Sequence, residues 1–313
     1  MNIFIELPTW LGDSVMTTPA IENLIKLYPK AKITFFGSFV STKIFKNHPN
    51  FDQSITDNSK KSKMRFKNLY KTAKSIDKKF DLAFSFRSSF SSKFLLFFIN
   101  ADKKYQYNKK LYKGHQVEKY NSFINSSLNT STKAEDLKIY AKKEIFKNKT
   151  LGINPGATYG SAKRWYPKEF AKSATALCKE YDIIIFGGKE EVDIAADIEK
   201  EFLKKGVKNY KNLAGKTTLQ ELIRYIGGLS LFITNDSGPM HIASAFKIPT
   251  IAIFGPTRYK ETSPWQNPNA IILRKELDCS PCMKRECPIK THECMKSITS
   301  EMVLKEIDKF LHN

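Results

Sequence analysis

The sequence predicts an α/β protein made of two Rossmann-like domains, and two observations lead to this fold class. Short apolar runs typical of buried strands alternate with amphipathic runs typical of helices, first from residue 2 onward and again from residue 151. The chain has 313 residues, which exceeds the usual size of one hydrophobic core. We therefore expect an N-terminal domain over residues 1–150 and a C-terminal domain over residues 151–313.

In the first half, the apolar run NIFIEL predicts a strand at residues 2–7, and PTWLGD predicts the loop that follows. Residues 14–29 predict a helix because their apolar side chains recur at helical spacing. The polar stretch at residues 121–132 is expected to be a loop. The other predicted elements are a strand at 31–38, a short helix around 42–46, a lysine-rich helix through 73–75 and a strand at 81–86.

The second half repeats this order of elements. Thr218 and Glu221 have capping-box spacing and predict a helix start. The amphipathic run 300–313 predicts a terminal helix, which packs either in the second domain or back on the first. The other predicted elements are strands at 151–154, 182–188, around 210–213, 229–234 and 249–255, and helices at 167–179, 190–202 and 240–246.

The stretch TNDSGPMHIASAFKIPTIAIFGPT, residues 234–257, joins two apolar strands through a short helix. Pro239 suits the start of that helix because its missing N–H is not needed there. A strand end followed by a helix N-terminus is the ligand edge of an open α/β sheet, and it attracts phosphate. The alternative is an ordinary turn whose Asp and Ser only cap the helix. The candidate anion-binding residues are Asp236, Ser237, Gly238 and His241.

Positive charge is concentrated in the first half. Residues 1–150 contain 28 Lys and Arg against 12 Asp and Glu, whereas the remainder contains 24 against 19. Such a surface attracts nucleic acid, an anionic membrane or a phosphorylated substrate. We find no zinc finger, no RRM-like pattern and no tandem repeat, so we do not expect a nucleic-acid partner.

Targeting and nucleotide motifs narrow the function further. The start of the chain lacks a secretory signal, and the longest apolar run, residues 94–99, is too short to span a membrane. For the phenylalanine-rich stretch 80–98 we favour core packing over lipid contact. LAGKTT resembles part of a P-loop, but Tyr210 occupies the position of the first glycine, and no G-x-G-x-x-G follows the first strand. We expect a cytoplasmic protein.

Three stretches together form a family pattern. They are LPTWLGDSVMTTPAIENL from Leu7, INPGATYGSAKRWYPKEFA from Ile153 and the stretch from Thr234 described above. In order, spacing and identity they resemble the heptosyltransferases of glycosyltransferase family 9, which build the inner core of lipopolysaccharide. The resemblance covers nearly the whole chain, and the third stretch is most similar to the members that add the second heptose. It implies a GT-B fold, with two Rossmann-like domains facing across a cleft.

The resemblance also implies a reaction. The second domain holds ADP-heptose, the first holds the acceptor, and L-glycero-D-manno-heptose is transferred with inversion and without a metal ion or cofactor. Asp13 matches the proposed general base of the family, which removes the proton of the acceptor hydroxyl. The alternative for Asp13 is the N-cap of a helix that starts at Ser14. Lys163 matches the lysine that meets the donor diphosphate and offsets the charge of departing ADP.

Further donor contacts follow from the same resemblance. Thr158 and Tyr159 match hydroxyl side chains around the phosphates, although Tyr159 departs from the paired threonines of some members. Arg164 is an alternative clamp for the diphosphate. Glu190 or Glu191 matches the region that holds the ribose, and either residue is also suited to begin a helix.

The predicted acceptor is an anionic lipopolysaccharide inner core, heptosyl-Kdo-lipid A, met by the basic first domain at the cytoplasmic face of the inner membrane. We expect Lys109, Lys110 and Lys113 to contribute to this surface, since charge acts on encounter with an anionic partner. The protein would then be peripheral to the membrane. Alternatives are another family 9 activity, heptosyltransferase I or III, or a basic module that binds nucleic acid or membranes.

Four of the five cysteines lie within CSPCMKRECPIKTHEC. Four thiols in such a short stretch are able to ligate a structural zinc ion, but their spacing is not that of a standard two-knuckle site. Cytosolic residence disfavours disulfides, so reduced structural thiols are the favoured interpretation. The residues concerned are Cys279, Cys282, Cys287 and Cys294.

Overall fold

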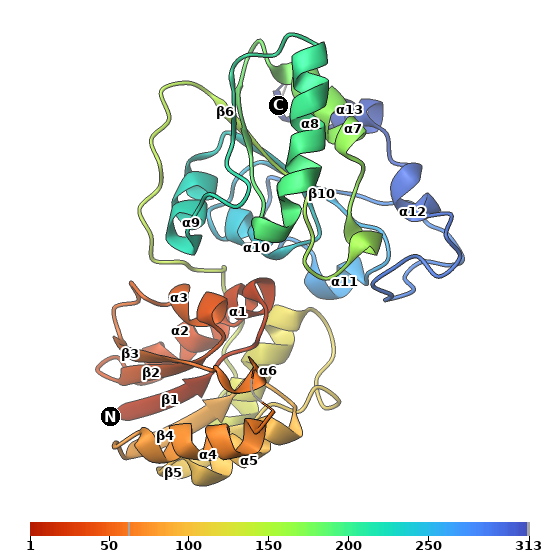
Figure 1. Cartoon of the computed structure of the whole chain (residues 1–313). Helices are drawn as coiled ribbons and strands as arrows, with labels where there is room; N and C mark the ends of the chain where they lie inside the picture. The colour runs from red at the N-terminus through yellow and green to blue at the C-terminus, as the bar shows by residue number, and fades with distance from the viewer. Residues whose placement is uncertain (62, 312–313) are drawn as a thin grey trace. The chain divides into compact units, whose positions relative to one another are not determined.

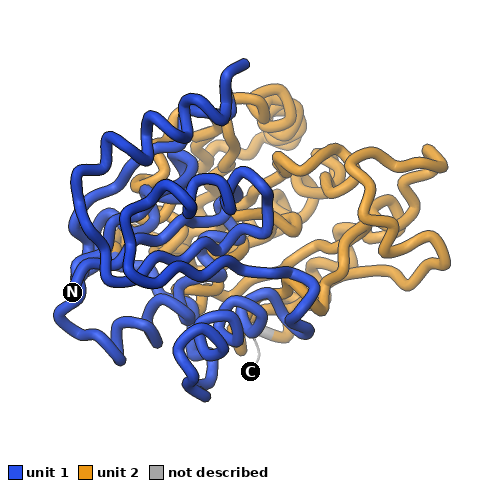
Figure 2. Tube along the Cα trace, turned by 90° about the horizontal axis from the view of Figure 1, so that it is seen from below, with its two compact units in different colours: residues 1–140 blue, residues 141–313 orange. Residues whose placement is uncertain are grey.

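The computed structural model describes residues 1–61 and 63–311, and the chain divides into two compact units, residues 1–140 and 141–313 (Figures 1 and 2). The division falls earlier than residue 150 because the segment after Tyr140 contacts the second unit. The Glu144 N–H donates to the carbonyl of Arg224, and the Lys143 ammonium lies over the Phe246 ring. Each unit is an alternating α/β structure, as the sequence predicts.

Unit 1 is built on a parallel sheet. Its strands are β1 (Asn2–Glu6), β2 (Lys32–Gly37), β3 (Phe51–Thr56), β4 (Phe80–Ser85) and β5 (Ala101–Gln106). Their order across the sheet is β3-β2-β1-β4-β5. The central position of β1 follows from its sequence, since it is apolar on both faces and fully buried from Ile3 to Ile5.

Helices cover both faces of this sheet. They are α1 (Leu11–Met16), α2 (Thr18–Leu27), α3 (Phe39–Lys43), the 3-10 turn η1 (Ser59–Lys61), α4 (Arg65–Ser75), α5 (Phe90–Phe98) and α6 (Gln116–Leu128). Figure 1 shows α4 and α5 side by side on one face, where Leu69, Leu95 and Leu96 pack against Phe4 and Phe80 of the sheet. The helix α6 packs against α1 and α2.

Two predictions about unit 1 were wrong. The single helix expected over residues 14–29 is divided into α1 and α2, because Pro19 occupies a helix start. The expected loop at residues 121–132 is helical as far as Leu128. Its apolar side chains, including Phe123 and Ile124, are buried, and a capping box at His115 starts the helix. The edge strands β3 and β5 were missed because they are rich in exposed polar residues.

Unit 2 is built on a six-stranded parallel sheet. Its strands are β6 (Thr150–Asn154), β7 (Asp182–Ile185), β8 (Tyr210–Asn212), β9 (Leu231–Asn235), β10 (Thr250–Ile253) and β11 (Ala270–Leu273). Their order is β11-β10-β9-β6-β7-β8. The predicted capping box at Thr218 is confirmed, since the Glu221 N–H donates to the Thr218 hydroxyl and the Thr218 N–H donates to the Glu221 carboxylate.

The helices of unit 2 also cover both faces of its sheet. They are η2 (Ser161–Lys163), α7 (Pro167–Leu177), η3 (Lys189–Glu191), α8 (Val192–Lys204), α9 (Leu219–Gly228), α10 (Gly238–Ala245), α11 (Tyr259–Thr262), α12 (Glu293–Lys296) and α13 (Ser300–Leu311). The terminal helix α13 packs in unit 2, against α7 and β10. No helix within residues 1–61 and 63–311 is long and apolar enough to cross a bilayer.

Both sheets have a topological switch point, where the order of strands along the chain reverses. In unit 1 it lies between β1 and β4, and in unit 2 between β6 and β9. Ligands of open α/β sheets bind outside the carboxyl ends of the strands at such points. The loops that follow these four strands are therefore the places to look for a functional site.

Candidate functional site

The switch point of unit 2 holds an ion pair between two of the predicted residues. Lys163, from the loop after β6, places its Nζ 2.6 Å from Oδ2 of Asp236, which follows β9. Asp236 is 4% exposed, and its carboxylate also accepts a 2.6 Å hydrogen bond from the Thr257 hydroxyl. The ammonium group is thus held in a fixed position at the ligand edge. Asp236 contacts the lysine, which makes it a positioning residue in this geometry.

The N-terminus of α10 adjoins this pair. Ser237 is the N-cap residue, but its side chain makes no cap hydrogen bond to the helix. Its hydroxyl instead lies 3.3 Å from Asn154 Nδ2 and 3.3 Å from the Thr234 hydroxyl. The N-terminus of a helix, with its first-turn N–H groups and the positive end of its dipole, attracts anions. His241, also predicted, is 3% exposed in the same helix.

Tyr159 links the Lys163 loop to the cysteine-rich segment. The Lys163 ammonium lies 4.9 Å from the centre of the Tyr159 ring, and the Arg285 guanidinium lies 5.6 Å from it. The Tyr159 hydroxyl donates a 2.7 Å hydrogen bond to the carbonyl of Met283. The Tyr159 ring thus contacts two cations, and its hydroxyl is hydrogen-bonded to a backbone carbonyl. Thr158 beside it is exposed.

The remaining donor candidates differ in exposure. Arg164 is half-buried, next to Lys163. Glu190 is exposed, whereas Glu191 is buried and accepts a 2.7 Å hydrogen bond from the Gly188 N–H. A Cβ on Gly156, in the loop after β6, would lie about 2 Å from the Glu191 carboxylate, so this glycine makes room for the acid. Both glutamates lie in the segment that follows β7, at the carboxyl end of that strand. A ribose contact by either one stays a prediction.

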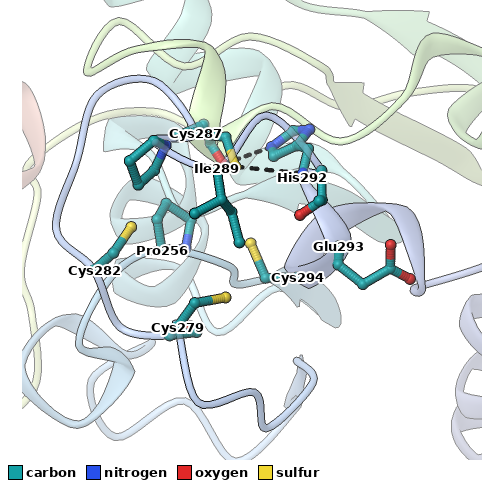
Figure 3. Close-up of a pocket in the computed structure, with 12 residues that line it drawn as sticks. Pro256, Cys279, Cys282, Cys287, Ile289, His292, Glu293 and Cys294 are labelled. Atoms are coloured by element: carbon teal, nitrogen blue, oxygen red, sulfur yellow. Dashed lines mark hydrogen bonds between the residues drawn. The ribbon is translucent and has the colours of Figure 1, made fainter.

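The four clustered cysteines, residues 279, 282, 287 and 294, line a pocket together with Pro256, Ile289 and His292 (Figure 3). The segment that carries them supports the Lys163 loop. Nε2 of His292 lies 2.9 Å from the carbonyl of Ala162, and the Ala162 N–H donates to the carbonyl of Arg285. The cysteine segment therefore acts on the site by holding the loop from which Lys163 projects.

None of the five cysteines takes part in a disulfide. Burial, together with the neighbouring thiols, raises the pKa of Cys294 to about 11. Backbone N–H donation, chiefly from His292, lowers the pKa of the Cys287 thiol. Across the part of the chain that the structure describes, no group of three or more His, Cys, Asp and Glu side chains has the arrangement to hold a metal ion.

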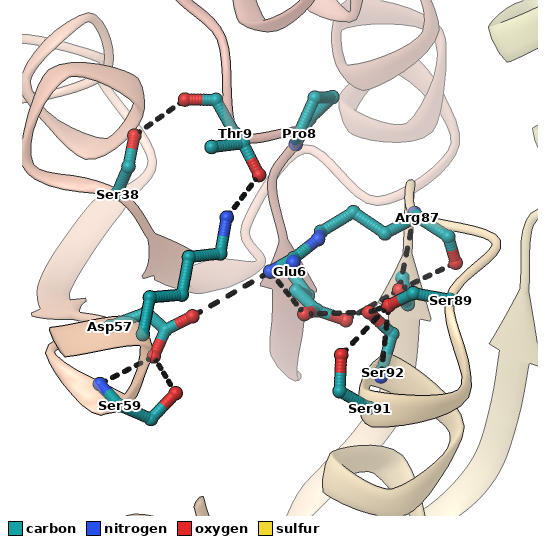
Figure 4. Close-up of polar contacts among 12 residues, drawn as sticks. Glu6, Pro8, Thr9, Ser38, Asp57, Ser59, Arg87, Ser89, Ser91 and Ser92 are labelled. Carbon is teal, nitrogen blue, oxygen red and sulfur yellow. Dashed lines mark hydrogen bonds and ion pairs between the residues drawn. The ribbon is translucent and has the colours of Figure 1, made fainter. Parts of the chain in front are cut away.

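The switch point of unit 1 holds a buried network (Figure 4). Glu6, at the end of β1, is 1% exposed, and its carboxylate accepts hydrogen bonds from Ser85, Ser92 and Arg87 at 2.5, 2.9 and 3.0 Å. The Arg87 guanidinium also lies 3.7 Å from Asp57. Burial raises the pKa of Glu6, and the charge of Arg87 offsets part of this rise. Two carboxylates thus fix Arg87 at the ligand edge.

Two further cations lie at this edge. Lys60 donates a 2.7 Å hydrogen bond to the Thr9 hydroxyl, and Arg65 donates to the Ser91 hydroxyl at 2.8 Å. Burial lowers the pKa of Lys60, and repulsion from Arg87 and Arg65 adds to this effect, although attraction to Asp57 and Glu6 opposes it. Like charges that gather at a ligand edge in spite of repulsion are typical of a site for an anion.

The sequence did not single out this network as a site, because its members come from separate parts of the chain. Glu6 and Arg87 are 81 positions apart. Two sequence signals were available. Glu6 is an acidic residue at the end of one apolar strand, and Arg87 is a basic residue directly after another apolar strand.

Asp13 lies beside the same edge, in the first helical segment after β1. The helix begins at Leu11, its N-cap is Trp10, and Asp13 belongs to its first turn. The alternative that Asp13 is an N-cap was therefore wrong, because the helix starts earlier than Ser14. Asp13 is half-buried, and its charge contributes to a raised pKa of buried Tyr120, for which burial is the main cause. Its role as a base stays a prediction.

The predicted acceptor lysines lie in the loop after β5, at the carboxyl end of that strand. Lys109, Lys110 and Lys113 are all exposed. The loop is anchored by Tyr107, whose ring stacks on Tyr112 at 5.7 Å, and by the Tyr112 hydroxyl, which lies 2.7 Å from that of Ser126. The structure thus brings the lysines to the ligand edge of the sheet and leaves their ammonium groups accessible.

The sequence model of glycosyltransferase family 9, the heptosyltransferases, matches residues 69–292. The chain belongs to this family. Among family 9 relatives, lipooligosaccharide heptosyltransferase 2 of Campylobacter jejuni is 44% identical over 325 residues, which cover 100% of this chain and 99% of that protein. The predicted enzyme class, a glycosyltransferase, is confirmed.

Solved family 9 structures share the fold. ADP-heptose LPS heptosyltransferase II of E. coli matches with a TM-score of 0.82 at 21% identity, over 99% of this chain and 98% of that chain. A second E. coli heptosyltransferase, solved with ADP, matches with a TM-score of 0.80 at 15% identity, over 99% of both chains. The predicted GT-B class, with two Rossmann-like units, is confirmed by these matches.

Proposed function

We propose that this family 9 enzyme transfers L-glycero-D-manno-heptose from ADP-heptose to the inner core of lipopolysaccharide, with inversion, and that it adds the second heptose. The observation that carries this proposal is the 44% identity over essentially the full length of a lipooligosaccharide heptosyltransferase 2. The two switch points supply the chemical groups that such a transfer needs.

The proposal places ADP-heptose at the switch point of unit 2. The diphosphate meets the N-terminus of α10, at Ser237 and Gly238, and the Lys163 ammonium, whose position Asp236 fixes at 2.6 Å. A glutamate after β7, Glu190 in our assignment, holds the ribose. Thr158 and Arg164 contact the phosphates from the Lys163 loop. The solved E. coli enzyme that shares this fold contains ADP, the nucleotide we assign here.

The reaction is a single displacement. The acceptor hydroxyl oxygen forms a bond to the anomeric carbon of heptose, and the bond from that carbon to the β-phosphate oxygen breaks. The hydroxyl proton passes to the Asp13 carboxylate. ADP departs with the bonding electron pair, and its added negative charge is offset by Lys163 and the positive end of α10. Because these groups supply the charge, the proposal requires no metal ion or cofactor.

The proposal places the acceptor at the switch point of unit 1. Heptosyl-Kdo-lipid A is anionic, and three cations at that edge, Lys60, Arg65 and Arg87, are suited to its acidic groups. The exposed lysines after β5 extend the same positive surface. Since the acceptor is anchored by its acyl chains, the enzyme works in peripheral contact with the cytoplasmic face of the inner membrane.

Mass spectrometry of the reaction products tests this function. The purified protein is incubated with ADP-heptose and, separately, with truncated lipopolysaccharide acceptors that carry no heptose or one heptose. We expect one heptose to be added to the acceptor that already carries one, with release of ADP. Addition only to the heptose-free acceptor would assign the first transfer instead. No addition to either acceptor, by protein that binds ADP, would overturn the proposal.

A further inference from the structure

Helix α5 lies on the surface of unit 1 but presents aromatic side chains outward. Its inner face buries Leu95 and Leu96 against the sheet. Phe90 and Phe97 are each 73% exposed, and their spacing of two turns places them on the same side of the helix. A surface helix normally turns polar residues to water. Two large exposed rings on one stripe therefore indicate contact with something apolar.

Helix α4 extends this apolar surface. Figure 1 shows α4 packed beside α5. Phe66 is 44% exposed and Tyr70 is 42% exposed, and the two residues are one turn apart on α4. The rings of Phe66 and Phe90 are 5.9 Å apart, which joins the two helices into one surface. We call Phe66, Tyr70, Phe90 and Phe97 the aromatic patch.

The charged residues of the two helices that carry the aromatic patch are all basic. Neither α4 nor α5 contains an acidic residue. The exposed lysines of α4 follow a stripe that lies next to the stripe of Phe66 and Tyr70, and Lys93 of α5 lies between Phe90 and Phe97. The basic residues of the two helices are Arg65, Lys67, Lys71, Lys74 and Lys93.

We propose that the aromatic patch and its lysines dock unit 1 on an anionic lipid bilayer. Aromatic rings enter the boundary between headgroups and acyl chains, while lysines extend their ammonium groups to lipid phosphates. Because α4 and α5 carry basic residues and no acidic ones, their charge is complementary to that of an anionic bilayer. The inference rests on the proposed function only for its purpose, which is to bring the enzyme to a lipid-anchored acceptor.

The finding changes one expectation from the sequence. Core packing was expected for the whole phenylalanine-rich stretch 80–98. It is confirmed for Phe80, Phe84 and Phe86, which are at most 2% exposed, and it was wrong for Phe90 and Phe97. Phe80 and Phe84 belong to the strand β4, whose residues 82–85 are all buried, and Phe86 directly follows it, whereas the helix α5 turns Phe90 and Phe97 away from the sheet.

Sedimentation with lipid vesicles tests the docking. The full chain is mixed with vesicles of phosphatidylethanolamine and phosphatidylglycerol, three to one, or of phosphatidylcholine alone, without lipopolysaccharide or sugar nucleotide. We expect binding to the anionic vesicles and weak binding to the neutral ones. The double variant Phe90→Ser, Phe97→Ser should bind about tenfold more weakly or worse. Leu203→Ser, which removes a 69% exposed leucine from α8 in unit 2, is the matched control and should bind like wild type.

A charge variant keeps the test informative if the double variant fails to fold. The triple variant Lys67→Gln, Lys71→Gln, Lys74→Gln should bind anionic vesicles more weakly, by about fivefold for each lysine that faces the lipid. Its vesicle binding should also depend less steeply on salt concentration. Equal vesicle binding by wild type and the folded double variant would overturn the proposal, as would sedimentation equilibrium that shows the aromatic patch holding a dimer. Vesicle binding is measured without acceptor or ADP-heptose, so its result does not depend on heptose transfer. The docking proposal and the proposed function can therefore fail separately.

Discussion

The two switch points differ in how their cations are held. In unit 2 the Lys163 ammonium pairs with Asp236 alone among the carboxylates that the structure describes, beside the positive end of α10. In unit 1 Arg87 lies between two carboxylates, Glu6 and Asp57, and other cations surround it. The first arrangement suits a small diphosphate, which needs one fixed charge and a helix terminus. The second suits a larger acceptor with several acidic groups.

The two proposed sites also differ in how much of each can be recognised from short stretches of sequence. The proposed nucleotide site is built mostly from two continuous stretches, the Lys163 loop and the start of α10, each recognisable by itself although Lys163 and Asp236 are 73 positions apart. The proposed acceptor site combines residues from separate elements, with a surface of exposed lysines and aromatic rings outside it.

The largest expected effect concerns unit 1 and separates chemistry from binding. Asp13→Asn should lower turnover about 10²–10⁴-fold, because the amide cannot accept the hydroxyl proton. Asp13 is not an N-cap, so the variant should fold with little loss of stability. The measurement is the initial rate at saturating concentrations of both substrates, with a thermal melt of the same preparation. If the variant retains more than about a tenth of wild-type turnover, Asp13 is not the base.

The next effect concerns unit 2. Lys163→Ala should lower turnover about 10²-fold, because a charge that stabilises the leaving group is removed. It should also leave the Asp236 carboxylate facing the diphosphate without its partner. Steady-state rates over a range of ADP-heptose concentrations measure both effects. Arg164→Ala is the control, with a smaller expected loss. A greater loss in Arg164→Ala than in Lys163→Ala would transfer the assignment to the arginine.

A third effect concerns the exposed lysines in the loop after β5 of unit 1. Reversal of charge at Lys109, Lys110 and Lys113 should raise the KM for the acceptor by roughly tenfold at low salt and leave ADP affinity unchanged. The three side chains are exposed at the ligand edge of unit 1, so their charge acts on the encounter with an anionic acceptor. Acceptor KM is measured at low and high salt. An unchanged KM at low salt would remove this loop from the acceptor surface.

The smallest effect concerns the loop that supports Lys163. The pKa of Cys294 is raised from 9.0 to about 11, so its neutral thiol contributes stability that is fully present below pH 9 and is lost as the pH rises through 11. Thermal melts between pH 8 and 11 should fall more steeply for wild type than for Cys294→Ser, by a few degrees. Cys178→Ser, which alters the cysteine outside the cluster, should follow wild type. Parallel curves for all three proteins would contradict the shift.

Much of the fold and part of the site could be predicted from the sequence. The strand and the helix start within residues 234–257 were predicted correctly because each depends on neighbouring residues, whereas the anion site there stays a prediction. The partnership of Lys163 with Asp236 and Thr257 was not predicted, because it joins three loops that meet only when the strands assemble. The same reason hid the Glu6–Arg87 pair. The edge strands β3 and β5 were not predicted because their exposed positions carry polar side chains, so they lack the apolar run typical of a buried strand.

We infer that unit 2 holds the nucleotide and that unit 1 supplies the base and the acceptor surface. Calorimetric titration of ADP into four proteins tests it most directly: wild type, Asp13→Asn, Arg87→Gln and Lys163→Ala. We expect the two unit 1 variants to bind ADP with wild-type affinity and Lys163→Ala to bind it about tenfold more weakly or worse, since a charged hydrogen bond to phosphate is lost. Weakened ADP binding by either unit 1 variant, with wild-type affinity in Lys163→Ala, would contradict it.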